Sequence, residues 1–441
     1  MISVAKTIER RYRQLAPGQA EAYRVLALLP GAYISPVGLA VALRVSPDTA
    51  VDRLASLEAV ELVQRVGDRW RLPDPYRAHA LTRSHELAHD PITVLTRYLE
   101  HRFIVSCSAA TQLSPQHRTL PVTLTDPHAI SLPAPVTGPT SALVWLAREQ
   151  DTLIHDIPAA AEAGLHALTA GLTQAIYPAI ELLPPKAAVA IHRTGLASAQ
   201  LCGEAIAERE IHISLAAALR RHGNLDEAIA HADRALHNAK RAGDLAGRAR
   251  AAQELGASQL ELRAIRPTGP DSDSAETLLS SALAWHKQND DSNGTSACHL
   301  WLGIAAFRDG LLHRALGHFE LALWHTRHPL AVARAQVWLG RGRLKLGEHT
   351  VAYRHLQQAA STYEIAGLHD TQASILKLRE TALGACPKCP ERSAPLARPP
   401  LKRTSLAPPH RRPPDAYTSL PASYHRISPH APRRPPSPEE P

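Results

Sequence analysis

Small residues recur at a fixed spacing between about residues 208 and 384, and this pattern constrains the fold more than any other feature. In each copy a small residue is followed by Gly seven positions later, by Ala five further on, and by Ala after seven more. Three segments fit directly: Ala216–Gly223–Ala228–Ala235, Gly303–Gly310–Ala315–Ala322 and Gly340–Gly347–Ala352–Ala359. A fourth, Gly256…Ala275–Ala282, fits when an insertion around residues 266–271 is allowed. This periodicity predicts a repeat architecture.

The spacing predicts pairs of closely packed helices. Residues seven apart lie on one face of a helix, where small side chains let a second helix approach. A glycine inside a helix costs about 1 kcal/mol relative to alanine, so Gly256, Gly303 and Gly340 indicate a steric need. The glycines at 223, 310 and 347 then end the first helix of each pair. Such pairs bury their apolar faces only by stacking on one another, which makes a solenoid.

These residues resemble the tetratricopeptide repeat in a long form. The register points are 40, 47 and 37 residues apart, from 216 to 256, 303 and 340. The family's proline after the second helix and its early aromatic are missing, although Trp301 and Trp338 lie near the aromatic position. The resemblance implies an array that binds proteins or peptides.

Composition supports helices and excludes several classes of protein. Aromatic residues make up only 4% of the chain while apolar residues make up 44%, which suits closely packed helices better than a sheet sandwich. The five cysteines are too few and too scattered for a disulfide scaffold. We find neither an apolar run of membrane-spanning length nor a signal peptide, so we expect a cytoplasmic protein without membrane contact.

The net charge of +8 is concentrated at the C-terminus. Residues 385–441 hold ten Lys or Arg and four Asp or Glu, which is +6, and leave +2 for the rest. The tail is also rich in proline, and we expect it to be disordered. Its charge predicts only non-specific contacts with nucleic acid.

Residues 1–104 have the element order of a winged helix-turn-helix. Helices are expected at 19–29, 36–43 and 47–59, with Ser46 capping the last, followed by a hairpin over 62–72. The third helix presents Asp48, Asp52 and Glu58 against a single Arg53. Carboxylates near phosphates repel, so packing or partner docking is favoured over DNA recognition.

A second resemblance covers most of residues 1–383. Segments 23–29, 36–43, 50–61 and 70–80 look like the winged-helix segment that follows the nucleotide-binding module in actinobacterial STAND regulators of the NB-ARC class. Residues 141–164 resemble their helical connector, and 165–203 their first, degenerate helix pair. Two departures matter. No G-x-x-x-x-G-K-[ST] loop occurs, and Pro73–Asp74 stands where the family has His-Asp. We therefore expect no bound nucleotide and no cofactor.

The predicted fold is all-α apart from one hairpin. It comprises a winged-helix-like domain (1–104), a Pro-rich linker (105–140), a helical connector with a degenerate repeat (141–207), tetratricopeptide repeats (208–384) and a disordered Pro/Arg-rich tail (385–441).

Patterns typical of catalysis or metal binding are scarce. Cys386-Pro-Lys-Cys389 has C-x-x-C spacing but lacks the second ligand pair that zinc needs. The 25 histidines form no H-E-x-x-H, and no G-x-S-x-G elbow occurs. We predict no catalytic or metal site and no enzymatic activity.

The candidate binding site is the concave face of the array. The tetratricopeptide resemblance implies ligand-facing positions on the first helix of each pair. From these we select the partner-binding residues Arg220, Arg221, Arg250, Gln253, Arg308, Arg334, Arg341 and Lys345. Among all the ligand-facing positions that the resemblance implies, seven are Arg or Lys and only two, Glu210 and Glu261, are acidic. This excess of positive charge favours an extended acidic peptide. The alternative is that these charges simply face solvent.

These observations predict a protein-interaction scaffold, or the sensor part of a bacterial STAND-like regulator. Two alternatives remain open: a DNA-binding transcriptional regulator acting through the winged helix, and a fragment of a nucleotide-dependent switch.

Overall fold

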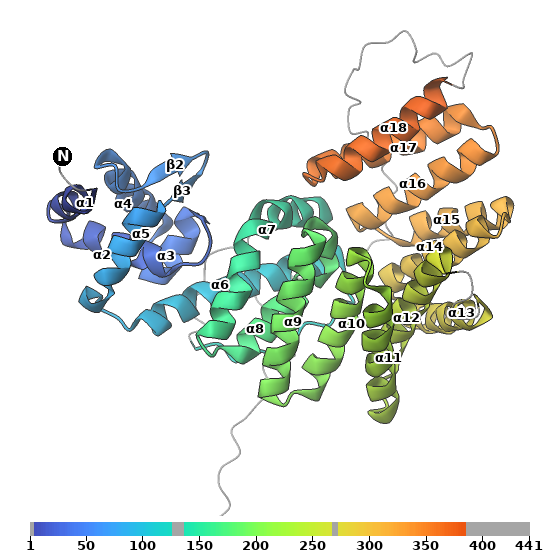
Figure 1. Ribbon diagram of the computed structural model, residues 1–441, viewed down its shortest axis with the longest axis horizontal. Helices are drawn as coiled ribbons and strands as arrows, with labels where there is room; N and C mark the ends of the chain where they lie inside the picture. The colour runs from blue at the N-terminus through green and yellow to red at the C-terminus, as the bar shows by residue number, and fades with distance from the viewer. Residues whose placement is uncertain (1–3, 126–135, 267–271, 385–441) are drawn as a thin grey trace, which may run out of the picture. The chain divides into compact units, whose positions relative to one another are not determined.

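Helices form nearly all of the regular structure in the computed structural model, which describes residues 4–125, 136–266 and 272–384 (Figure 1). The predicted tail at 385–441, with Cys386 and Cys389, lies outside the described residues, as does part of the predicted linker. In the described ranges, the helices are all too short or too polar to cross a lipid bilayer.

The N-terminal elements form a winged helix with a small sheet. The elements are α1 (Val4–Tyr12), α2 (Pro17–Leu28), β1 (Tyr33–Ile34), α3 (Pro36–Leu43), α4 (Pro47–Ala59), β2 (Gln64–Val66), β3 (Arg69–Arg71), α5 (Asp74–Thr82) and η1 (Ser84–Glu86). The Ser46 hydroxyl accepts a hydrogen bond from the Thr49 N–H at 3.1 Å and caps α4, as predicted. The predicted hairpin is β2–β3, and β3 also pairs with β1, which the sequence did not reveal.

The winged helix is held by a small apolar core. Tyr23, Leu39, Leu54 and Trp70 are buried where α2, α3, α4 and β3 meet. Arg77 of α5 donates to the carbonyls of Ala27, Leu29 and Gly31, and so fixes α5 against the end of α2.

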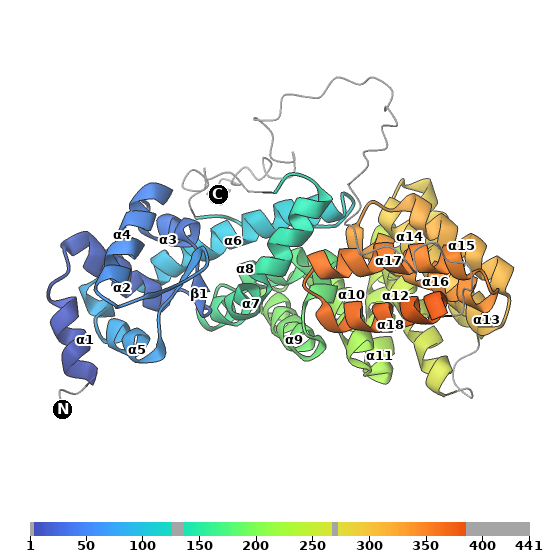
Figure 2. The ribbon, with the colours of Figure 1, turned by 90° about the horizontal axis from the view of Figure 1, so that it is seen from above.

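A long helix, α6 (Pro91–Leu113), leads from the winged helix towards the repeats (Figure 2). Its first half packs on α3, where Gly38 leaves room for the Tyr98 ring, and its second half packs on α8 (His166–Ala175), where Gly171 faces Phe103. The predicted boundary at residue 104 therefore falls inside a helix.

A buried ion network joins the wing to the connector. Arg102 of α6 bonds Asp156 at 2.8 Å and Glu149 at 2.7 Å, both on α7 (Pro139–Glu162), and Arg69 of β3 bonds the same Glu149. Breaking such a network would leave charges buried without partners, so it fixes the wing on α7.

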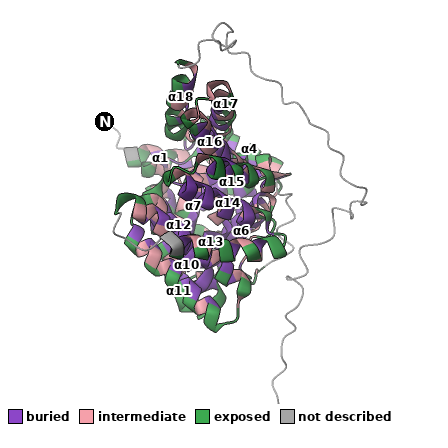
Figure 3. Cartoon of the chain, turned by 90° about the vertical axis from the view of Figure 1, so that its right-hand side faces the viewer, coloured by how far each residue is buried: buried purple, intermediate pink, exposed green. Residues whose placement is uncertain are grey.

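The remainder is a series of antiparallel helix hairpins (Figure 1). It comprises α7 (Pro139–Glu162), α8 (His166–Ala175), η3 (Tyr177–Leu182), α9 (Pro185–Cys202), α10 (Ala205–His222), α11 (Leu225–Arg241), α12 (Leu245–Ile265), α13 (Ser272–Gln288), α14 (Ser292–Arg308), α15 (Leu312–His325), α16 (Pro329–Lys345), α17 (His349–Ile365) and α18 (His369–Gly384). Buried residues lie where helices face one another, and exposed ones lie on the outward faces (Figure 3).

The small residues act as the register predicted. A Cβ atom added to Gly256, Gly303 or Gly340 would come within 2.9, 2.5 or 2.6 Å of Leu279, Phe319 or Leu356, respectively. Each of those three side chains lies on the second helix of the same pair. Gly223, Gly310 and Gly347 adopt positive φ angles of 91°, 78° and 75° where the first helices end. The predicted repeat solenoid is thus confirmed.

Candidate functional site

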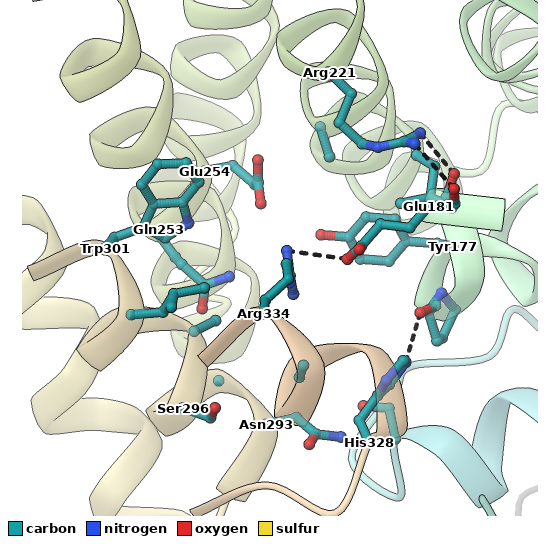
Figure 4. A pocket seen from close by; sticks show the side chains of 18 of the residues that line it. Tyr177, Glu181, Arg221, Gln253, Glu254, Asn293, Ser296, Trp301, His328 and Arg334 are labelled. Atoms are coloured by element: carbon teal, nitrogen blue, oxygen red, sulfur yellow. Dashed lines mark hydrogen bonds and ion pairs between the residues drawn. The ribbon is translucent and has the colours of Figure 1, made fainter. Parts of the chain in front are cut away.

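A pocket of about 440 Å³ opens on the concave side of the repeats (Figure 4). The first helices of the pairs, α10, α12, α14 and α16, supply most of its walls. Six of the eight predicted residues line it: Arg220, Arg221, Arg250, Gln253, Arg308 and Arg334. Arg341 and Lys345 do not line it.

The end of α6 and the connector close one side of this pocket. The His328 Nε2–H donates to the Pro178 carbonyl at 2.8 Å, and the Asn293 amide donates to the Leu113 carbonyl at 2.9 Å. Arg334 pairs with Glu181 of η3 at 3.1 Å. These contacts join residues that are more than a hundred positions apart, and the repeat pattern carries no signal for them. The array therefore folds back against its own connector.

Arg220 is held in an internal ion pair. Its side chain is only 9% exposed, Nε donates to Glu254 at 3.2 Å, and Nη1 donates to Glu261 at 3.4 Å. The guanidinium also lies 4.8 Å from the centre of the Trp301 ring. Burial by itself lowers the pKa of Arg220, but the two carboxylates raise that pKa well above its ordinary value. Arg220 therefore builds the pocket wall.

The other arginines of the wall also have acceptors within the protein. Arg221 donates to the carbonyls of Ile180 and Glu181, and burial lowers its pKa. Arg250 bonds Glu210, and Arg308 donates to the Leu260 carbonyl at 2.7 Å.

A segment after α6 also lies against the concave helices. Arg118 reaches Glu210 at 3.1 Å and Asp244 at 2.7 Å, and Leu120 is buried against Ile211. Part of the face that sequence analysis left open is thus covered by the chain itself.

Arg341 and Lys345 differ from these residues because neither has a carboxylate partner within the described residues. The Arg341 guanidinium lies 4.8 Å from the centre of the Trp338 ring, and the Lys345 ammonium lies 5.7 Å from that of Phe307. The two rings pack edge to face at 5.5 Å. Partial desolvation lowers the pKa of Arg341. We call Phe307, Trp338, Arg341 and Lys345 the platform.

The charge of the pocket itself is nearly balanced. Its five lining arginines face four carboxylates, those of Glu181, Glu254, Glu261 and Asp291. The surplus of positive charge expected for the groove is therefore confined mainly to the platform, which adjoins the pocket through Trp338.

Two titratable groups that line the pocket are uncharged near neutral pH. Burial raises the pKa of the Tyr177 phenol, and burial together with Arg250 lowers the pKa of His117 to about 4, so both groups are neutral near pH 7. In the described ranges, the side chains of His, Cys, Asp and Glu form no group of three or more that could hold a metal ion.

Two basic residues of the winged helix, on α4 and β3, pair with carboxylates within the protein. Arg53 on α4 pairs with Glu21 at 3.3 Å, and Arg69 on β3 pairs with Glu149. Arg65 on β2 lies over the Trp70 ring, 5.1 Å from its centre.

The chain is similar in sequence to a regulatory protein that is longer than the chain itself. No family model matches this chain. The regulatory protein AfsR of Streptomyces griseus is 26% identical over 395 residues, which cover 82% of this chain and 39% of AfsR. The chain thus spans about two fifths of that relative.

Among solved structures, similar folds include a STAND protein with a tetratricopeptide-repeat sensor from Pyrococcus horikoshii. It has 13% identity and a TM-score of 0.37 and covers 87% of this chain and 56% of that one. BtubC from P. vanneervenii has 20% identity and a TM-score of 0.31, covering 59% of this chain and 95% of that one. The chain is a winged helix followed by a solenoid of helix hairpins, and it resembles the winged-helix and tetratricopeptide-repeat region of STAND regulators; its 441 residues contain no phosphate-binding loop motif.

Proposed function

We propose that this chain is the non-enzymatic sensor part of a cytoplasmic bacterial regulator, and that it holds a segment of a partner protein on the concave face of its repeats. The similarity to a regulatory protein supports the first half of the proposal. The second half depends on one observation: the first helices of successive repeats bring their inward-facing side chains to a single hollow.

The dimensions of the site suit a partner segment. A volume of about 440 Å³ is within the usual range for binding pockets and accepts a few side chains. The platform lies beside it and extends the contact area along α16. In this proposal Arg220, Arg221, Arg250 and Arg308 shape the wall, and Gln253 and Arg334 contact the partner inside the pocket.

A site-specific cross-linking experiment tests this function. A photo-reactive amino acid replaces Ala297, which lines the pocket, or Leu321, which is 42% exposed on α15 outside it. Irradiation in the native host should give a discrete protein adduct from position 297 and none from position 321. Equal labelling at both positions, or labelling by nucleic acid at 297, would refute the assignment of the concave face.

DNA recognition through the winged helix is not our proposal, because Arg53 and Arg69 already pair with carboxylates inside the protein. Recognition of base edges needs such side chains to be free at the surface.

A further inference from the structure

Two platform residues, Trp338 and Lys345, occupy positions of the repeat at which the residue type differs from one repeat to the next. Two residues before the small residue, α12 carries Glu254, whereas α14 and α16 carry Trp301 and Trp338. Five residues after it, α12 carries Glu261, whereas α14 and α16 carry Arg308 and Lys345. The same two positions are thus acidic in one repeat and aromatic and basic in the next two. The later repeats lack the carboxylates that neutralise Arg220.

The aromatic rings leave the cations available to a ligand. A guanidinium stacked on a ring uses its flat face, and its N–H groups at the edge remain free for a carboxylate. Trp338 cannot easily move away, because it also stacks on Phe319 at 5.7 Å, and Phe319 is wedged against Gly303. Arg341 and Lys345 are therefore held in place without being neutralised.

The spacing of the two cations indicates the form of the ligand. Residues four apart on a helix lie about 5–6 Å apart at Cβ. In an extended chain, side chains at positions i and i+2 share one face and are about 6.7 Å apart. Two acidic residues separated by one residue can therefore reach Arg341 and Lys345 together. An apolar residue two positions further along the same face would meet Ile304 and Trp338 at the pocket wall.

The neighbouring charges disfavour nucleic acid as the occupant. A nucleic-acid strand carries a phosphate at every nucleotide, and its groove must be basic along its whole length. Here Glu181, Glu254 and Glu261 line the adjoining pocket. A peptide can present its acidic residues to the platform and an apolar residue to the pocket.

We infer, resting on the proposed function, that the platform recognises an extended acidic segment of the partner protein with the pattern apolar-x-acidic-x-acidic. Its carboxylates bind the exposed edges of Arg341 and Lys345, and its apolar side chain contacts the rings.

A defined peptide tests this inference. The probe is a fluorescent Phe-Ser-Glu-Ser-Glu peptide with blocked ends, so that only side-chain carboxylates are charged, and its Gln analogue is the uncharged control. Fluorescence anisotropy with the full chain should show saturable binding of the Glu peptide that weakens with salt, because exposed ion pairs are screened. The Gln analogue should bind at least tenfold more weakly.

Variants then locate the site. Arg341→Glu with Lys345→Glu, and the milder Arg341→Gln with Lys345→Gln, should each lower the affinity at least tenfold. The matched control is Lys240→Glu with Arg241→Glu, an exposed pair at the end of α11, and its affinity should be unchanged. Melting temperatures of all variants confirm folding.

Three outcomes overturn the inference: no saturable binding at about 1 mM peptide, equal loss of binding in the α11 control, or tighter binding of single-stranded oligo(dT) at the platform. A protein adduct from position 297 together with any of these would leave the proposed function standing and remove only the acidic motif.

Discussion

Arg220 and Arg341 were predicted to share one concave face, and the structure gives them different surroundings. Arg220 on α10 is packed between Glu254 and Glu261 of the next repeat. Arg341 on α16 lies on Trp338 without a carboxylate partner in the described part of the chain. The position of a residue within the repeat thus predicts which face its side chain lies on. Whether its charge is neutralised depends on the residues of the neighbouring repeat.

The largest effect should follow from breaking the Arg220 pair. Arg220→Ala leaves two carboxylates in a poorly solvated wall, and loss of one partner of a buried ion pair costs about 3–5 kcal/mol. The melting temperature should fall sharply, and Arg220→Ala with Glu254→Gln should recover part of the loss. A decrease no larger than that of Arg341→Ala would show that the two arginines do not differ.

A smaller loss is expected from crowding beneath the platform. Gly303→Ala puts a Cβ against Phe319, which supports Trp338, and overpacking of this kind costs about 1–3 kcal/mol. Gly317→Ala on α15 is the control, because its Cβ would meet nothing within 4 Å and alanine is the better helix former. Thermal unfolding should show loss in the first variant and no loss in the second.

Acidification should destabilise the fold through His117, which lines the pocket. Burial and then Arg250 lower the pKa of His117 to about 4 in the folded chain, below its ordinary value of 6.5. An unfolded chain therefore binds more protons between pH 6.5 and 4, and stability falls as pH falls through this window. The melting temperature should be lower at pH 5 than at pH 7. His117→Gln should reduce this slope, and an unchanged slope would contradict the role of His117.

The smallest effect belongs to the platform itself. Arg341→Ala and Lys345→Ala remove exposed cations that have no carboxylate partner in the described residues, so stability should change by no more than about 0.5 kcal/mol. A loss comparable to that of Arg220→Ala, measured in the same thermal assay, would mean that these cations have a structural role.

Local sequence patterns predicted much of the fold. The spacing of small residues predicted the helix pairs, because each glycine must admit one side chain of its partner helix, as Gly340 admits Leu356. Turn and cap chemistry located α4 and the β2–β3 hairpin. The strand β1 was not predicted, because its two residues are too few to show the alternation of apolar and polar side chains that marks a strand. The end of α6 was not predicted. The prolines beyond residue 114 indicated a linker, and its predicted start at residue 105 lies before the end of the helix at Leu113.

The site was less predictable than the fold. Six of the predicted residues reach one pocket, yet Tyr177 and Glu181 come from a short 3-10 helix outside the repeat register. The partner of Arg334 is Glu181, which lies on a segment far away in the sequence. Spacing within a repeat contains no information about contacts over more than a hundred residues.

The contacts of His328 and Arg334 with η3 have a further consequence. Open solenoids often gain or lose units at an end, because each unit meets only its neighbours. Here the unit containing α16 also rests on the connector, so duplication or deletion of an internal unit would separate these surfaces. These contacts therefore require a fixed number of units between η3 and α16.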